Sequence, residues 1–265
     1  MNRHNNNAEV VLRAEGIGMT FNPDTAEAIT AIADIGFELH RGEVVAIVGP
    51  SGCGKTTLFN IIAGLLEPTQ GQIDVNGEPV HNATGHVGYM LQKDLLLPWR
   101  TVMDNVIIGL QVRNTPRKQA EQIARTLIEA YGLKGFENSY PSALSGGMRQ
   151  RVAFMRTLAF SPDVILLDEP FSALDSQTRL ILQSDVLRII RERNCSVVLV
   201  THDVGEAITM ADRIVVITSR PGRVKSVHQV GITPDLRHPL KIRKQPRFTE
   251  LYETIWAELG IDLAA

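Results

Sequence analysis

The 265-residue sequence has few cysteines, little net charge and no long apolar segment. Its two cysteines, Cys53 and Cys195, are too few for a disulfide framework and indicate a reducing compartment such as the cytosol. No uncharged apolar run approaches the roughly 18 residues of a membrane span, so membrane association would require a partner. The net charge of −2 argues against broad electrostatic binding to nucleic acid. Residues 1–9 lack the apolar stretch of a signal peptide and are expected to form a disordered lead-in.

The octapeptide at residues 49–56 matches the pattern G-x-x-x-x-G-K-[ST] of the phosphate-binding loop in nucleoside triphosphatases. In such a loop the glycines let backbone N–H groups face phosphate oxygens, Lys55 supplies a positive charge, and the Thr56 hydroxyl can ligate Mg²⁺. The apolar run at 44–48 predicts a buried parallel strand before the loop, and residues 57–63 predict a helix whose N-terminus faces the phosphates. This context disfavours the alternative, a plain glycine turn. The residues expected to bind nucleotide here are Gly49, Pro50, Ser51, Gly52, Cys53, Gly54, Lys55, Thr56 and Thr57.

An apolar strand predicted at 164–167 leads into two acidic residues, Asp168 and Glu169. In a parallel sheet the carboxyl ends of the strands face the ligand. Asp168 is therefore expected to hold Mg²⁺ through its water shell, and Glu169 to activate the attacking water as a general base. The alternative is a surface turn with two solvated acids. Together with the phosphate-binding loop, this strand predicts an ATPase or a GTPase.

A second helix end suited to phosphate is predicted at Ser145-Gly146-Gly147, which open a helix at 148–160. One ATP needs only one phosphate-binding loop, so this helix end is expected to reach a nucleotide held mainly by another subunit. Ser-Gly-Gly alone is usually a loop, but its position about 20 residues before the acidic strand strengthens the interpretation.

The rest of the chain predicts an α/β fold with a helical insertion. Strands are predicted at 10–14, 35–39, 72–75 and 87–91, with Asn76-Gly77 as a hairpin turn. A helix is predicted to begin at Thr115-Pro116, with Thr115 as its N-cap, and to end at Gly132. After Pro162 strands and helices alternate at 164–167, 176–192, 196–201, 204–210 and 213–218, which implies a parallel sheet flanked by helices.

The C-terminal part, residues 231–265, is predicted to be a basic arm that ends in an amphipathic helix. The segment 220–247 that leads into it carries eight Lys or Arg residues against one acid, Asp235. The apolar face of the helix consists of Phe248, Leu251, Tyr252, Ile255, Trp256 and Leu259. The arm can bind a membrane surface or a partner; alternatively, the helix packs on its own domain and the charges are solvated.

These motifs together resemble the ATP-binding subunit of ABC transporters, over about residues 10 to 260. Residues 144–148 match the family's signature, although Met148 stands where glutamine is most usual. The resemblance implies a P-loop NTPase (RecA-like) core with an N-terminal antiparallel β subdomain and an inserted α-helical subdomain at about 93–160, all within an ATPase domain at 10–230. It also implies ATP and Mg²⁺ as the ligands.

Further roles follow from the resemblance at single positions. Gln92 matches the glutamine that senses Mg²⁺ and contacts the membrane subunit, and Asp175, in the segment 172–175, matches the loop that crosses between two ATP sites. His202 matches the histidine that contacts the γ-phosphate, and Phe21 matches an aromatic residue that stacks on adenine. Taken alone, such a histidine is usually a satisfied strand-end residue and such a phenylalanine is usually core. The residues so assigned are Glu169, His202, Gln92 and Lys55 for catalysis, and Thr56, Gln92 and Asp168 for the metal.

Three segments resemble one branch of the family, the importers of nitrate, sulfonate, taurine and similar small anions. They are residues 97–102 with 105–106, residues 219–223, and the helix at 251–256. Trp99 lies in the first of them, and its alternative role is ordinary packing. The resemblance implies a homodimer that sandwiches two ATP, two transmembrane permease subunits, an extracytoplasmic solute-binding protein as an indirect partner, and a place at the cytoplasmic face of the membrane. It implies no nucleic acid and does not identify the solute.

Other functions are weighed against this one. A non-transport ABC ATPase of DNA repair or translation usually has long coiled-coil insertions or two cassettes, and this chain shows neither. A GTPase-like switch reads guanine through an Asn-Lys-x-Asp type of loop, which is absent from the sequence. Within the family, an exporter, or an importer of an unrelated solute such as a vitamin precursor, remains an alternative.

Overall fold

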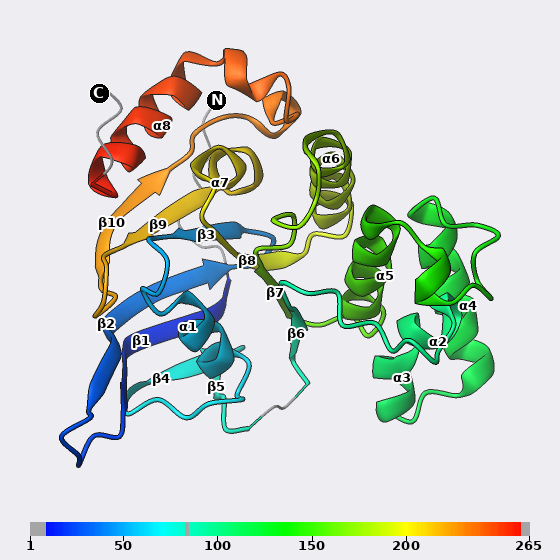
Figure 1. Ribbon diagram of the computed structural model, residues 1–265, viewed down its shortest axis with the longest axis horizontal. Coiled ribbons are helices and arrows are strands. Elements are labelled where there is room, and N and C mark those ends of the chain that lie inside the picture. Colours follow the sequence, from blue (N-terminus) through cyan, green and yellow to red (C-terminus); the bar gives the residue numbers. More distant parts are fainter. Residues whose placement is uncertain (1–8, 83–84, 261–265) are drawn as a thin grey trace.

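The computed structural model describes residues 9–82 and 85–260, and it contains two β-sheets and a block of helices (Figure 1). A six-stranded sheet has the strand order β10-β9-β3-β8-β7-β6, and a four-stranded sheet has the order β2-β1-β4-β5. Residues 1–8 of the predicted lead-in lie outside the described residues. Glu9, its last residue, forms an ion pair with Arg41 at 2.6 Å.

The six-stranded sheet is parallel except at one edge. Strands β6, β7, β8, β3 and β9 pair in parallel, and β10 is antiparallel to β9. Their bounds are β3 Val44–Val48, β6 Val87–Met90, β7 Val164–Asp168, β8 Ser196–Thr201, β9 Arg213–Ile217 and β10 Val224–Gln229. Every residue of β3, β7 and β8 is buried, because helices or the second sheet cover both faces. This explains why β3 is apolar throughout and why β7 and β8 are apolar over residues 164–167 and 197–200.

The four-stranded sheet is antiparallel and forms the lower left of Figure 1. Its strands are β1 Val10–Phe21, β2 Ile29–His40, β4 Gln70–Val75 and β5 Glu78–Pro79. The predicted hairpin turn is confirmed: Asn76 and Gly77, with φ of 53° and 78°, join β4 to β5.

The helices form two groups. α1 Lys55–Ile62, α6 Ser176–Glu192 and α7 Val204–Met210 lie close to the sheets, whereas α2 Val102–Val106, α3 Ile108–Val112, α4 Arg117–Ala130 and α5 Gly146–Leu158 form a block at the right of Figure 1. α8 Pro246–Glu258 packs against α7. Three 3₁₀ turns lie at Pro141–Ala143, Pro234–Leu236 and Ile242–Lys244. The predicted α/β fold with an N-terminal antiparallel sheet and a helical insertion is confirmed.

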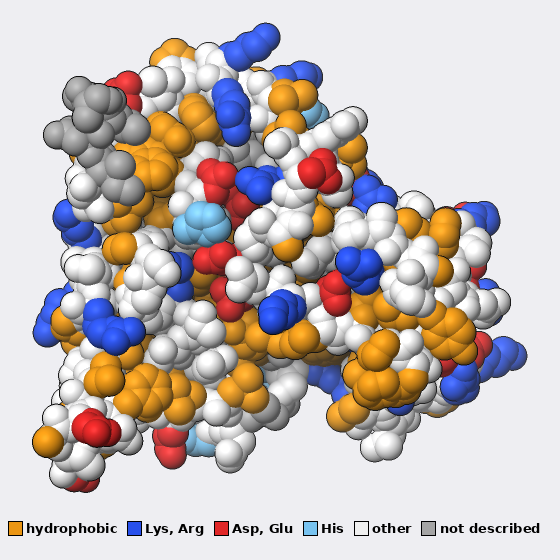
Figure 2. Space-filling model, in the orientation of Figure 1, with side chains coloured by type: hydrophobic (Ala, Val, Ile, Leu, Met, Phe, Trp, Pro, Cys, Tyr) orange, Lys and Arg blue, Asp and Glu red, His pale blue; other side chains and the backbone are white. Residues whose placement is uncertain are grey.

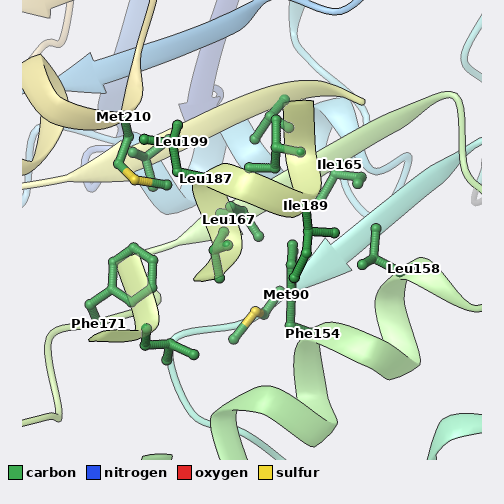
Figure 3. Close-up of a cluster of buried hydrophobic side chains, with 14 of the residues drawn as sticks. Met90, Phe154, Leu158, Ile165, Leu167, Phe171, Leu187, Ile189, Leu199 and Met210 are labelled. Atoms are coloured by element: carbon green, nitrogen blue, oxygen red, sulfur yellow. The ribbon is translucent and has the colours of Figure 1, made fainter. Parts of the chain in front are cut away.

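The hydrophobic core divides into two clusters on opposite sides of the six-stranded sheet. Val45 and Ile47 of β3 belong to the cluster shared with α1 and the four-stranded sheet, whereas Ala46 and Val48 belong to the cluster shared with the other helices. Figure 3 shows the second cluster, in which Phe154 of α5 lies near β7 and α6. The helical block therefore shares a continuous core with the sheet.

Several predicted elements differ from the structure. β1 and β2 are longer than the strands predicted at 10–14 and 35–39, and α5 begins two residues before the predicted 148–160. Pro116, rather than Thr115, is the N-cap of α4. The short helices α2 and α3 were not predicted. β10 lies inside the basic segment 220–247, where no strand was predicted; it is an edge strand whose residues alternate between half-buried and exposed, so its sequence carries no apolar run.

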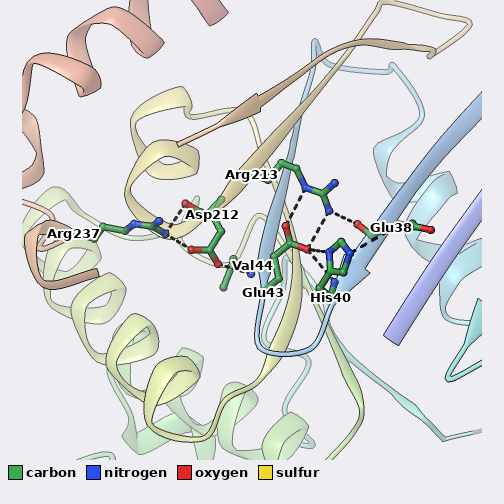
Figure 4. Close-up of polar contacts among 8 residues, drawn as sticks. Glu38, His40, Glu43, Val44, Asp212, Arg213 and Arg237 are labelled. Atoms are coloured by element: carbon green, nitrogen blue, oxygen red, sulfur yellow. Dashed lines mark hydrogen bonds and ion pairs between the residues drawn. The ribbon is translucent and has the colours of Figure 1, made fainter. Parts of the chain in front are cut away.

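The C-terminal arm packs on its own domain. Phe248, Leu251 and Ile255 of α8 are buried in the core cluster beside α7. Arg237 is also buried; it pairs with Asp212 at 2.7 Å, and the second carboxylate oxygen of Asp212 accepts the Val44 N–H at 2.9 Å (Figure 4). The arm is thus bonded to the start of β3, and the expectation that all its charges are solvated is wrong. Among the described residues, every helix is too short or too polar to span a bilayer.

Candidate nucleotide-binding site

The phosphate-binding loop connects β3 to α1 at the carboxyl edge of the parallel sheet. Gly52 and Gly54 have φ of 75° and 98°, a region that favours glycine. A Cβ at Gly49 would lie 2.5 Å from the Ile217 side chain, and a Cβ at Gly54 would overlap Ile32. Space and backbone conformation therefore require glycine at these places.

Lys55 begins α1 and is 7% exposed. Its ammonium donates hydrogen bonds to the carbonyl oxygens of Gly49 at 2.8 Å and Pro50 at 2.9 Å. The Cys53 Sγ lies 3.5 Å away. The charge of Lys55 is thus held beneath the loop, where phosphate oxygens would meet it.

The loop is held in place by two segments that are distant in sequence. The Gly222 N–H donates to the Ala31 carbonyl at 3.0 Å, and the Ala33 N–H donates to the Gly222 carbonyl at 2.9 Å. A Cβ at Gly222 would overlap the Cys53 carbonyl oxygen. The guanidinium of Arg220 donates to the Gly52 carbonyl at 3.4 Å.

A cleft of about 750 Å³ opens beside the loop. Phe21, 39% exposed at the end of β1, lies on its wall with Ile29 and Ala31 of β2. The other residues that line it are Ser51, Gly52, Gly54, Lys55, Thr56, Thr57, Glu169, His202 and Arg220. Arg220 was not predicted to line the cleft. It lies in the segment 219–223, which was singled out only for its resemblance to the importer branch.

Three residues from separate loops meet at the end of β7. The Glu169 Oε2 lies 3.1 Å from His202 Nδ1 and 3.3 Å from Gln92 Nε2. Glu169 itself has a φ of 44°, and its N–H donates to the Val200 carbonyl at 2.9 Å. The structure thus brings together three of the four residues expected to be catalytic.

Asp168, one position earlier, is 6% exposed. Burial raises the pKa of its carboxyl group, and the hydroxyl of Tyr89 opposes this by donating a hydrogen bond at 3.3 Å. Burial, followed by the charge of Asp168, also raises the pKa of Tyr89, which keeps this donor protonated. Asp168 is therefore a buried carboxylate that a nearby cation would stabilise.

Ser145, Gly146, Gly147 and Asp175 are not among the described residues that line this cleft. They lie at the N-terminal ends of α5 and α6, which adjoin, since a Cβ at Gly147 would lie 2.6 Å from Thr178. Ser145 caps α5 by accepting the Met148 N–H at 3.3 Å, and Asp175 caps α6 by accepting the Thr178 N–H at 3.0 Å. Hydrogen bonds from Thr178 lower the pKa of Asp175.

A family model described as "ABC transporter" matches residues 32–172, more than half of the chain. The chain belongs to this family. It is 44% identical to the uncharacterized ABC transporter ATP-binding protein YtlC of Bacillus subtilis, over 88% of this chain and 90% of that protein. It is 39% identical to the taurine import ATP-binding protein TauB of Jannaschia sp., over 92% of each, and 41% identical to TauB of Pelagibacter ubique, over 92% of this chain and 93% of that one.

Solved structures agree with this assignment. A dimeric post-hydrolysis state of the ATP-binding cassette MJ0796, bound to ADP and Pi, aligns with a TM-score of 0.72 and 30% identity, over 84% of this chain and all of that one. The ABC ATPase is therefore an enzyme that couples ATP hydrolysis to transport, as the sequence predicted.

Proposed function

We propose that this ABC ATPase powers an importer of a small anion of the sulfonate, taurine or nitrate type. The support is that taurine import proteins align with 92% of the chain at about 40% identity. The branch-like segments at 97–102 and 219–223 agree with it. Under this proposal the chain lies at the cytoplasmic face of the membrane beside two permease subunits, an extracytoplasmic binding protein delivers the solute, and nucleic acid plays no part.

We further propose that two copies pair head to tail and enclose two ATP molecules. Ser145 and Gly146 are exposed at the start of α5 and lie outside the cleft of their own chain. A helix N-terminus attracts phosphate, so this end suits the nucleotide held by the partner copy. The related cassette MJ0796 was solved as a dimer.

The proposed mechanism of ATP hydrolysis is based on the close contacts of Glu169 with His202 and Gln92. Glu169 accepts a proton from the attacking water, while His202 and Gln92, each within hydrogen-bond distance of its carboxylate, orient it. Lys55 and the loop N–H groups stabilise the charge on the phosphate oxygens, and Phe21 stacks on the adenine.

Mg²⁺ fits the oxygen donors at this site. The Thr56 hydroxyl, the buried Asp168 carboxylate and the amide oxygen of Gln92 are ligands that a hard cation accepts, directly or through water. Bound there, the ion would neutralise charge on the phosphates.

The surface around Trp99 is proposed to contact the permease. Trp99 is 71% exposed, so the alternative of ordinary core packing is wrong. Buried Asn105 fixes this loop: its amide accepts the Leu97 N–H at 2.8 Å and donates to the carbonyls of Arg100 and Thr101 at 3.1 and 2.9 Å. Figure 2 shows further hydrophobic side chains gathered on the helical block. A rigid loop that presents an exposed tryptophan is typical of an interface anchor.

We expect Trp99→Ala to leave the basal ATPase of the isolated subunit within a few-fold of wild type and to weaken co-purification with the permease sharply. Truncating an interface anchor often costs ~2 kcal/mol or more. Trp256→Ala is the matched control, because Trp256 packs on the core; it should lower the melting temperature and leave permease binding by the folded fraction intact. A Trp99→Ala protein that is unstable, yet still binds the permease, contradicts the coupling role.

The solute class is tested by growth. A strain that lacks this gene should fail to grow on one anion of the class, such as taurine, another sulfonate or nitrate, as its only sulfur or nitrogen source. Plasmid-borne wild type should restore growth, and Glu169→Gln should not. Normal growth on all such anions, with a defect on an unrelated solute such as a vitamin precursor, contradicts the proposed cargo but leaves the ATPase assignment intact.

A further inference from the structure

A second cavity, of about 340 Å³, lies between α6, α7 and the C-terminal arm. Ser176 and Arg179 line it from α6, Asp203 and Glu206 from α7 and its N-cap, and Leu240 and Arg243 from the arm. Its volume falls at the small end of the range for small-molecule sites. It is distinct from the nucleotide cleft, with which it shares no lining residue.

Three buried polar side chains line this cavity, those of Gln183, Glu206 and Thr209, and the acidic one, Glu206, is 6% exposed. One oxygen of its carboxyl group accepts a hydrogen bond from Gln183 at 3.3 Å, and the other has no partner among the described residues. Burial, followed by the charge of Asp203, raises the pKa of Glu206 to about 8, although hydrogen bonds from Thr201 and Gln183 oppose the rise. At neutral pH the group is therefore mostly protonated and can donate a hydrogen bond.

The charges around the cavity favour an anion. The cavity is lined by two positively charged guanidinium groups, of Arg179 and Arg243, and by one carboxylate, Asp203, which lies 3.9 Å from Arg179. Arg243 has no ion-pair or hydrogen-bond partner for its side chain among the described residues. Guanidinium groups bind planar or tetrahedral oxyanions through paired hydrogen bonds.

The walls of the cavity continue directly into the catalytic loops. Asp203 follows His202, and Ser176 follows Asp175. The third wall, the arm, is a separate segment joined to α7 through α8. A ligand that bridges the arm to α6 and α7 would restrain the two segments that carry His202 and Asp175.

We propose that this cavity is a regulatory site for a small organic oxyanion, a carboxylate or a sulfonate, whose binding slows ATP hydrolysis. Arg179 and Arg243 bind its charged oxygens, and Glu206 donates to a further oxygen. The site does not depend on which solute the transporter carries.

Calorimetric titration of the full-length protein tests this, with saturating ADP present so that the phosphate-binding loop is blocked. The probes are taurine and methanesulfonate in one arm, and acetate and succinate in the other, which separates sulfonates from carboxylates. We expect saturable binding in one arm and slower ATP hydrolysis when that probe is present. Arg243→Gln should weaken binding at least about tenfold, as expected for a lost charged hydrogen bond. Lys244→Gln removes the same charge from the next residue, which does not line the cavity, and should change binding less than about twofold.

The pH dependence gives an independent readout. The charged groups that act on Glu206 are Asp203 at the start of α7 and Arg179 on α6, and Arg243 lines the same cavity from the arm. Because an ionised Glu206 would repel the anion, affinity should fall as the pH rises through about 8. Glu206→Gln, which keeps a donor, should flatten this profile. The proposal is overturned if no probe binds saturably, if Arg243→Gln and Lys244→Gln lose affinity equally, or if a bound probe leaves the hydrolysis rate unchanged.

Discussion

Glu169→Gln should lower the rate of ATP hydrolysis ~10²–10⁴-fold, the usual effect of removing a general base, and still permit ATP binding. The Glu169 carboxylate is the group that His202 and Gln92 both approach, at 3.1 and 3.3 Å. Lys55 is held by loop carbonyls that do not involve Glu169, so the phosphate contacts should survive. The variant should therefore form a stable dimer with ATP, measurable by size-exclusion chromatography alongside a phosphate-release assay.

Glu253→Gln is the matched control, because Glu253 is exposed on α8, far in sequence from the loops that form the cleft. It should leave both the hydrolysis rate and the ATP-dependent dimerisation unchanged. Hydrolysis near the wild-type rate by purified Glu169→Gln would show that another residue is the base.

Ser145→Arg should reduce hydrolysis roughly 10²-fold or more, the size of effect seen when a transition-state donor is removed, and leave the ATP affinity of the monomer nearly unchanged. Ser145 is exposed and lies outside the cleft of its own chain, so a large side chain there blocks the partner's nucleotide and spares its own phosphate-binding loop. The lost cap of α5 costs about 1 kcal/mol, which is too little to unfold the subunit.

Ser142→Arg introduces the same side chain three residues earlier, at an exposed position before the helix, and should have little effect. Titration of the monomer with nucleotide shows whether Ser145 acts on the partner's nucleotide or on the nucleotide bound by its own chain. If Ser145→Arg weakens ATP binding by the monomer as much as Lys55→Ala does, the two-chain site is wrong.

The elements that surround the cleft could be predicted because the sequence of each one is sufficient to indicate its secondary structure. The strands β3, β7 and β8 consist of apolar runs at 44–48, 164–167 and 197–200. α6 has its capping Asp175 directly before it, and its predicted span 176–192 is confirmed. The acids at the end of β7 follow from the rule that ligands bind at the carboxyl ends of parallel strands.

Features that depend on residues far apart in the chain could not be predicted. Arg220 reaches the loop at Gly52, and Arg237 pairs with Asp212, through folding that brings these segments together. β10 depends on pairing with β9 rather than on its own apolar pattern. The Glu206 carboxyl reads in sequence as an ordinary helix residue, since only tertiary packing buries it.

The attachment of the phosphate-binding loop to β2 and to Gly222 has a consequence for protein engineering. Backbone hydrogen bonds and close contacts tie residues 31–33, 53–54 and 222 into one unit, so the loop's shape is set by three stretches of chain. A chimera that receives only residues 49–56 from a relative would inherit mismatched neighbours at Ile32 and Gly222. The loop sequence alone therefore does not carry its shape with it. Nucleotide affinity can be transferred between relatives only when all three stretches are exchanged together.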